Sequence, residues 1–344
     1  ACHYCGPCYR GCSTGSYFSS QSSTLPAAEA TGNMTLKANA VVERLEYDTE
    51  SGKISQVHVI DAVTKKRETY SAKIFFLCAS TVGSTQILLN SASEEFPNGL
   101  ANSSGTLGHY MMDHTLGLSG VGVFLDNMDS YYHGNRPTGL YIPRFRNLEG
   151  QDKDADFLRG YGYQAVTIRM DWMTGMNTKG FGAPLKESLR KPGPWVFALA
   201  GFTECLPRES NRMYLSKDKV DRYGIPQVVF DFEWSDNEVN LRRDAQENAD
   251  RLLKAAGAVI TMSGEDGMSL PGEGIHEMGT ARMGDDPKQS VLNAYNQAHD
   301  VPNLFVTDGS FMTSSSCVNP SLTYMAFTAR ACDYAVKQIA QGNL

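Results

Sequence analysis

The feature that most constrains the fold is a continuous apolar run at residues 73–79, which reads Lys-Ile-Phe-Phe-Leu-Cys-Ala. A run that is apolar on both faces is typical of a buried strand in a parallel sheet. The next stretch, residues 80–91, places Val82, Ile87 and Leu88 on a common helical face. The run therefore predicts a strand–helix unit, and we expect a mixed α/β (α+β) chain.

Segments with the alternation typical of half-buried strands precede this unit, and more strands follow it. The early ones are residues 34–36, 40–47, 54–60 and 69–72. The later ones are residues 118–125, 163–170, 195–202 and 227–234. A helix is expected from Ser235, as its N-cap, to about Ala256, because Gly257 follows. An antiparallel sheet with helices on one side is the natural assembly for residues 116–270.

Size and charge limit the classes of function. The 344 residues, 41% of them hydrophobic, can fill two cores or one large core. No apolar run approaches the ~20 residues of a membrane helix, so we expect no membrane span. The net charge of −7, with acidic and basic residues interspersed, indicates no nucleic-acid partner.

The polar residues that suggest chemistry lie near the C-terminus. His276 precedes Gly279-Thr280, a strand-like run ends in Asp308-Gly309, and Asn319 precedes a proline. Histidine is the side chain best suited to accept a proton near neutral pH. Asparagine can orient an oxygen without changing charge. Together these residues resemble the floor of an active site.

Three stretches resemble a known family. Residues 276–284 are similar to the HxxGTxxMG segment of the glucose–methanol–choline (GMC) flavin oxidoreductases, in their bacterial sugar or alcohol dehydrogenase branch. Residues 304–310, followed by Asn319-Pro320-Ser321-Leu322-Thr323, look like the second signature of that family. Residues 99–114 resemble its GLGNSSGxVGRNLMDH passage, with His109 in place of the common arginine. We interpret His114, the last residue of that passage, as a structural, hydrogen-bonded histidine.

The resemblance implies an enzyme that oxidises the CH–OH group of an alcohol or sugar. His276 would accept the hydroxyl proton, a hydride would pass to flavin N5 of FAD, and Asn319 would orient the alcohol oxygen. The implied FAD contacts are Val42 near the adenine, Ala79 at the end of the apolar run, Asp308 and Gly309, and Pro320 and Leu322 at the flavin ring. The family often has glycine where Ser80 stands. For Glu277 we expect only a structural or surface role.

The resemblance also implies a division of the chain. Residues 1–115 and 271–344 would form a discontinuous FAD-binding domain of the doubly wound type, and residues 116–270 a substrate domain. No strand–GxGxxG–helix unit occurs in the sequence, so we expect the N-terminal βαβ unit to be missing from this stretch. Four aromatic residues could face a sugar-like ligand, although a core position is the preferred interpretation for each. They are Tyr131, Tyr132, Trp172 and Trp195.

Half of the eight cysteines fall within the first twelve residues. Cys2, Cys5, Cys8 and Cys12 follow the spacing C-x2-C-x2-C-x3-C of bacterial ferredoxins, although Ser13 replaces the usual proline. An iron–sulfur cluster, a zinc site and a structural loop of thiols or disulfides all remain open. A cluster would conduct electrons away from the flavin, as expected for a dehydrogenase with an electron-transfer subunit; without a cluster, oxygen or a diffusible quinone remains open as the acceptor, and the enzyme could be an oxidase.

A different class of function also remains open at this stage, a non-enzymatic electron-transfer or binding module centred on these cysteines. The sequence begins Ala1-Cys2 without a signal-peptide pattern, so we expect the natural N-terminus to lie upstream. The sequence does not decide between cytoplasm and periplasm.

Overall fold

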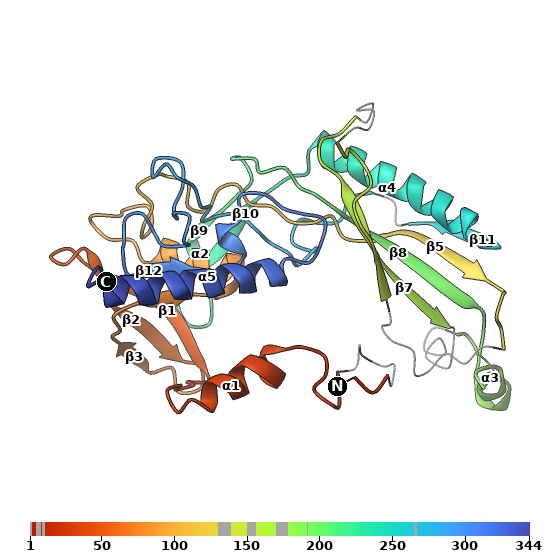
Figure 1. Cartoon of the computed structure of the whole chain (residues 1–344), viewed down its shortest axis with the longest axis horizontal. Coiled ribbons are helices and arrows are strands. Elements are labelled where there is room, and N and C mark those ends of the chain that lie inside the picture. Colours follow the sequence, from red (N-terminus) through yellow and green to blue (C-terminus); the bar gives the residue numbers. More distant parts are fainter. Residues whose placement is uncertain are drawn as a thin grey trace. The chain divides into compact units, whose positions relative to one another are not determined.

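The computed structural model of the chain describes residues 2–4, 8, 11–129, 139–149, 156–169, 178–190, 192–264 and 267–344. The chain divides into two compact units, and Figure 1 labels most of their helices and strands. The first unit consists of Ala1–Leu36, Leu116–Thr203 and Val239–Met268, and the second of Lys37–Thr115, Glu204–Glu238 and Ser269–Leu344. Each unit is therefore built from three separate segments of sequence.

The first unit contains a five-stranded antiparallel sheet with the order β11-β5-β8-β7-β6. Its strands are β5 (Leu118–Phe124), β6 (Gly139–Ile142), β7 (Tyr161–Arg169), β8 (Trp195–Thr203) and β11 (Ile260–Ser263). Helix α4 (Asp236–Ala255) packs Leu241, Ala245 and Leu253 against Tyr163 of β7 and Leu199 of β8. The expected antiparallel sheet with a helix on one side is confirmed. Three short helices belong to this unit as well, η2 (Ser20–Thr24), α1 (Leu25–Glu29) and α3 (Gly182–Ser188).

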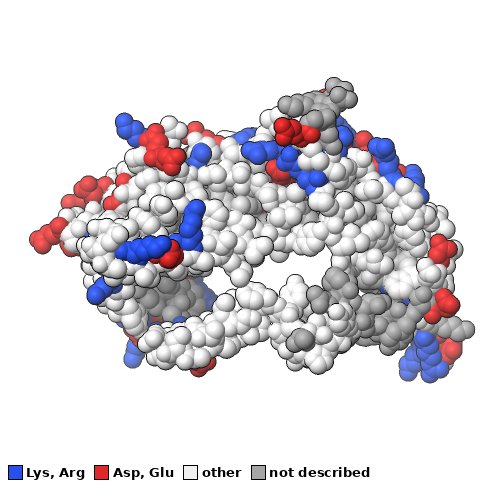
Figure 2. Space-filling view, in the orientation of Figure 1, with Lys and Arg blue, Asp and Glu red and all other residues white. Residues whose placement is uncertain are grey.

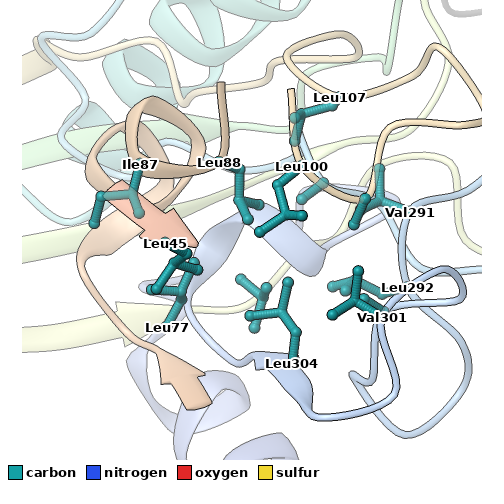
Figure 3. Close-up of a cluster of buried hydrophobic side chains, with 14 of the residues drawn as sticks. Leu45, Leu77, Ile87, Leu88, Leu100, Leu107, Val291, Leu292, Val301 and Leu304 are labelled. Atoms are coloured by element: carbon teal, nitrogen blue, oxygen red, sulfur yellow. The ribbon is translucent and has the colours of Figure 1, made fainter. Parts of the chain in front are cut away.

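The second unit contains a parallel strand pair, as the apolar run predicts. In it, β4 (Phe75–Leu77) pairs with β12 (Leu304–Val306), with Phe75 opposite Leu304. Helix α2 (Ser80–Asn90) follows β4 directly, and the one-turn helix η4 (Gly309–Phe311) follows β12. The buried side chains of these elements, among them Leu77, Leu88 and Leu304, form one core with Leu45 (Figure 3).

The remaining elements of the second unit are a three-stranded antiparallel sheet, a hairpin and a long helix. They are β1 (Ala40–Asp48), β2 (Lys53–Asp61), β3 (Arg67–Tyr70), β9 (Arg212–Val220), β10 (Pro226–Asp231) and α5 (Ser321–Ala340). Sequence reasoning assigned no element to residues 321–340. The short strand expected at residues 34–36 is wrong, because this stretch is irregular and pairs with no strand.

One strand joins a different sheet from the one expected. The strand predicted at residues 227–234 is β10, which forms a hairpin with β9 in the second unit instead of extending the five-stranded sheet. The hairpin is held there by polar contacts: Gln86 of α2 donates to the Pro226 carbonyl at 2.8 Å, and the Met213 amide donates to the Gly108 carbonyl at 2.8 Å. Residues 204–238 thus belong with 37–115, and residues 1–36 with the first unit, which differs from the expected domain bounds.

The charged side chains are mixed in sign. Figure 2 shows lysine and arginine next to aspartate and glutamate on the face that it displays. Several are ion-paired, such as Arg146 with Asp244 at 2.8 Å and Lys254 with Asp250 at 2.6 Å. Among the described residues, no helix is long and apolar enough to cross a membrane.

Candidate functional site

The segment that carries His276 lies between two other stretches of the second unit. On one side Met278 and Met112 exchange both backbone hydrogen bonds, each at 2.9 Å. On the other side the Gly279 amide donates to the Gly309 carbonyl at 3.1 Å, and the Met283 amide donates to the Phe311 carbonyl at 3.0 Å. The three stretches singled out in the sequence are therefore neighbours in the structure.

The backbone of this segment has unusual conformations at both ends of the histidine. Gly279 has φ +84°, and a Cβ there would clash with the Tyr110 carbonyl. Ile275 (φ +51°) and Thr280 (φ +77°) also lie in the left-handed region, which is costly for β-branched residues. The backbone of residues 275–280 thus has a conformation that the intrinsic preferences of these residues disfavour.

Asp113 holds this backbone conformation in place. Its Oδ1 accepts hydrogen bonds from the amides of His114 (2.8 Å) and His276 (3.1 Å). Its Oδ2 accepts from the amides of Gly272 and Gly274, both at 3.0 Å. The side chain is buried, and burial raises the pKa of the carboxyl while these four amides oppose the rise. Since all four partners are donors, the ionised carboxylate is the form that satisfies them.

His276 lies between His114 and Asn319. Its Nδ1 is 2.9 Å from Nδ1 of His114, with the rings edge to face, and its Nε2 is 3.0 Å from Nδ2 of Asn319. Nε2 of His114 contacts the Ser316 carbonyl. The predicted pair, His276 and Asn319, is therefore in direct contact, and His114 is hydrogen-bonded as expected.

Burial decides the charge of both histidines. It lowers the pKa of the fully buried His114 to about 4. It also lowers the pKa of the half-buried His276, partly opposed by the negative charge of Glu277. Both rings are therefore neutral near pH 7, and His276 is able to accept a proton.

Two of the residues predicted to contact FAD follow the carboxyl ends of the parallel strands. Ala79 is the N-cap of α2 after β4, and Asp308 is the N-cap of η4 after β12. Asp308 is buried and accepts from the Ser310 amide at 3.0 Å and from the Ser84 hydroxyl. Ser80, where the family often has glycine, takes the left-handed backbone that glycine favours, with φ +67°.

The other predicted cofactor residues differ in exposure. Pro320 is buried at the N-cap of α5, while Leu322 in the first turn is 77% exposed. Gly309 allows a close approach, because a Cβ there would clash with the Glu277 carbonyl and the Thr81 hydroxyl. Val42 packs against the core shown in Figure 3. Pro320 and Leu322 thus lie directly after Asn319 at the start of α5, and Val42 is partly buried against the core.

The cysteine motif is only partly described, since Cys5 lies outside the described residues. The Cys12 thiol is 3.4 Å from the Thr14 hydroxyl and accepts from the Ser16 amide at 3.2 Å; such contacts lower its pKa to about 6. Among the described residues, no group of three or more His, Cys, Asp or Glu side chains could hold a metal ion.

Of the four aromatic candidates for a sugar surface, Tyr131, Tyr132 and Trp172 lie outside the described residues. Trp195 is half-buried at the start of β8, where its indole N–H donates to the Asn127 carbonyl at 3.1 Å. The residue that sequence reasoning missed is Asp113. Its signal was present, since it directly precedes His114 in the passage at residues 99–114.

Two family models described as GMC oxidoreductase match the chain, over residues 1–116 and 207–328. The 2-methyl-1,2-propanediol dehydrogenase of Mycolicibacterium austroafricanum is 35% identical over 96% of this chain and 59% of that protein. The fructose dehydrogenase large subunit of Gluconobacter japonicus is 30% identical over 88% of this chain and 54% of that subunit.

A similar fold is found in a solved structure, the pyridoxine 4-oxidase from Mesorbium loti. Its TM-score is 0.61 at 17% identity, over 92% of this chain and 61% of that one. The chain thus spans little more than half the length of the relatives that it matches.

Proposed function

Because the chain belongs to the GMC oxidoreductase family, we propose that it carries the catalytic residues of an FAD-dependent enzyme that oxidises an alcohol or sugar to a carbonyl. The observation that carries the proposal is the contact between Nε2 of His276 and the Asn319 side chain at 3.0 Å. Oxidation of a CH–OH group removes a proton from oxygen and a hydride from carbon. A neutral histidine next to an amide can accept the proton.

In the proposed reaction His276 is the general base and Asn319 the residue that orients the alcohol oxygen. The base must be unprotonated before the reaction, and burial of His276 favours its neutral form. The Asn319 side chain is exposed, so that a hydroxyl group can reach both residues. As the O–H bond breaks, the proton moves to Nε2 of His276, and the amide of Asn319 stabilises the oxygen without a charge of its own.

The residues of this chain fit FAD at two places. The parallel strands β4 and β12 end side by side at Ala79 and Asp308, which is where open α/β sheets bind ligands. The exposed Leu322, three residues after Asn319, offers an apolar surface to a flat ring system. When bound, FAD supplies the hydride acceptor. We propose Ala79, Gly309, Pro320 and Leu322 as its contacts, with Asp308 shaping the turn and Val42 at the adenine end.

Within this proposal the second unit carries the catalytic residues and the cofactor contacts. Residues 116–270, which include the five-stranded sheet, are proposed as the substrate-binding domain. Two of the relatives are named as dehydrogenases of a diol and of fructose, which supports a small polyol or sugar as substrate. One of them is a large subunit, which supports a partner subunit for this protein, and the electron acceptor is proposed to be that subunit or a quinone.

The cysteine motif at Cys2, Cys5, Cys8 and Cys12 does not carry the proposal. Neither the relatives' names nor the described residues support an iron–sulfur cluster there. Membership in an oxidoreductase family also disfavours the non-enzymatic module centred on these cysteines. Analysis for iron and acid-labile sulfide in the purified protein decides whether the motif binds a cluster.

The proposal is tested on the flavin-loaded protein, mixed without oxygen with a panel of diols and sugars. We expect flavin absorbance to be lost in the unaltered protein. His276→Asn should slow this step by about 10²–10⁴-fold with flavin content unchanged, which is the usual contribution of a general base. His109→Gln is the control, because the ring of His109 contacts the Glu209 carbonyl instead of the site. Normal turnover in His276→Asn would contradict the role of His276 as the base. If none of the diols and sugars reduces the flavin, the proposed substrate class is wrong.

A further inference from the structure

The fully buried His114 contacts the proposed base but has no role in the proposed chemistry. Its Nε2 faces the Ser316 carbonyl oxygen. A carbonyl oxygen accepts hydrogen bonds and never donates them, so the hydrogen of this contact must belong to Nε2. This assignment follows from the chemistry of the partner alone.

The other nitrogen of the ring is then determined by the charge. His114 is completely shielded from solvent, and burial lowers its pKa to about 4. Its ring is neutral near pH 7, so Nδ1 carries a lone pair and no hydrogen. Nδ1 of His276 lies 2.9 Å away and must supply the hydrogen of that contact. If Nδ1 of His276 carried no hydrogen either, the lone pairs of the two nitrogens would face each other at 2.9 Å.

We propose that His114 is a positioning residue that fixes the tautomer of His276, with the hydrogen on Nδ1 and the lone pair on Nε2. The 3.0 Å contact with Nδ2 of Asn319 agrees, because the amide N–H donates to that lone pair. The inference rests on the proposed role of His276 as the base. It adds that the nitrogen facing Asn319 is ready to accept a proton because of a residue on the opposite side of the ring.

The same arrangement suits the state after proton uptake. When the O–H bond of the alcohol breaks and an N–H bond forms at Nε2, His276 becomes a cation and its Nδ1–H still donates to His114. Since the proton affinity of the buried His114 is low, the proton remains on His276. The other ionisable groups next to the pair are Glu277, whose negative charge raises the pKa of His276, and Asp113. The oxygens of Asp113 are engaged by four backbone amides, so the acceptor next to His276 is the neutral ring of His114.

The experiment is a ¹⁵N NMR measurement on the protein labelled at histidine, with the His276 signals assigned by their loss in His276→Asn. In the unaltered protein near neutral pH we expect Nδ1 of His276 to be protonated and Nε2 to be unprotonated. The reverse pattern overturns the proposal without any variant of His114.

Two variants then test the cause. His114→Phe keeps a flat ring but removes donor and acceptor, and we expect the hydrogen of His276 to redistribute to Nε2. His114→Gln offers one donor and one acceptor without a titrating ring, and should restore the Nδ1–H form. In the flavin-loaded protein, His114→Phe should slow flavin reduction at least tenfold with little change in KM, and His114→Gln should recover most of it. An unchanged tautomer in His114→Phe assigns His114 to packing alone and overturns the proposal.

The NMR result does not depend on turnover, which separates the two hypotheses. If His276→Asn keeps normal activity while His114→Phe shifts the tautomer, the proposed function falls and the positioning role stands. If His276→Asn is inactive while the tautomer ignores His114, the positioning role falls and the proposed function stands.

Discussion

Replacing Asp113 by asparagine tests whether this carboxylate holds the backbone next to His276. The change exchanges one acceptor oxygen for an NH2 group with almost no change of shape. Each oxygen now accepts two backbone amides, those of His114 and His276 at Oδ1 and those of Gly272 and Gly274 at Oδ2. In either orientation of the asparagine, one buried and one partly buried amide lose their acceptor and face another donor.

The expected loss of stability follows from that count. A buried donor without a partner costs about 1–3 kcal/mol, so the pair costs at least about 1 kcal/mol and at most about 6 kcal/mol. The upper value is a large share of the ~5–15 kcal/mol that stabilises a typical domain. Asp48→Asn is the matched control, because Asp48 makes the same kind of turn contacts, with the amides of Glu50 and Ser51, in an exposed place where water can substitute. It should change the unfolding free energy by less than about 0.5 kcal/mol.

The assay is urea unfolding followed by fluorescence, together with hydrogen exchange at residues 272–276. Asp113→Asn should lower the midpoint, and the amides of Gly272 and Gly274 should exchange faster than in the unaltered protein. A loss below about 1 kcal/mol, or unchanged exchange at these amides, would contradict the claim that Asp113 holds the segment.

Three further outcomes are expected. Gly309→Ala should cost about 1–3 kcal/mol, because its Cβ would clash with the Glu277 carbonyl; equal melting temperatures for the two proteins would contradict this. Ile275→Asn should raise the free energy of unfolding by about 1 kcal/mol, since asparagine tolerates the left-handed backbone and the isoleucine is 76% exposed. Ile275→Val should leave it unchanged, and calorimetry distinguishes the two variants. Flavin reduction should rise with pH through a pKa below ~6.5 and then level off, because burial lowers the pKa of His276 and the base must be neutral; an acidic limb above that value would be inconsistent with the assignment.

Local pattern predicted much of the fold and of the site. The apolar run at residues 73–79 predicted the parallel strand β4, and the strand-like segments that follow it predicted β5, β7 and β8 within two residues. The sequence could not show that β10 leaves the five-stranded sheet, because its pattern fits either sheet and the choice depends on contacts with α2 and Gly108.

Part of the candidate site could be predicted from the sequence and part could not. His276 and Asn319 stand out by residue type and motif, and the structure places them in contact. The roles of Asp113 and His114 depend on hydrogen bonds that reach about 160 residues along the chain, such as the one between His114 and His276 with a separation of 162. The passage at residues 99–114 marks both residues, but residue type and spacing do not show which distant groups their side chains contact, and the same carboxylate would also suit an ordinary turn.

The parallel pairing of β4 with β12 has a consequence for biosynthesis. Leu304 pairs with Phe75 across more than two hundred intervening residues, and Asn303 bonds the Ile54 backbone at a separation of 249. Relative to a ten-residue loop, closing so long a loop costs about 3 kcal/mol of chain entropy. At ~5–20 residues per second, a ribosome needs roughly 10–50 s to make β12 after β4. During that interval the apolar strand is without this partner, so we expect the nascent chain to depend on chaperones until β12 has emerged from the ribosome.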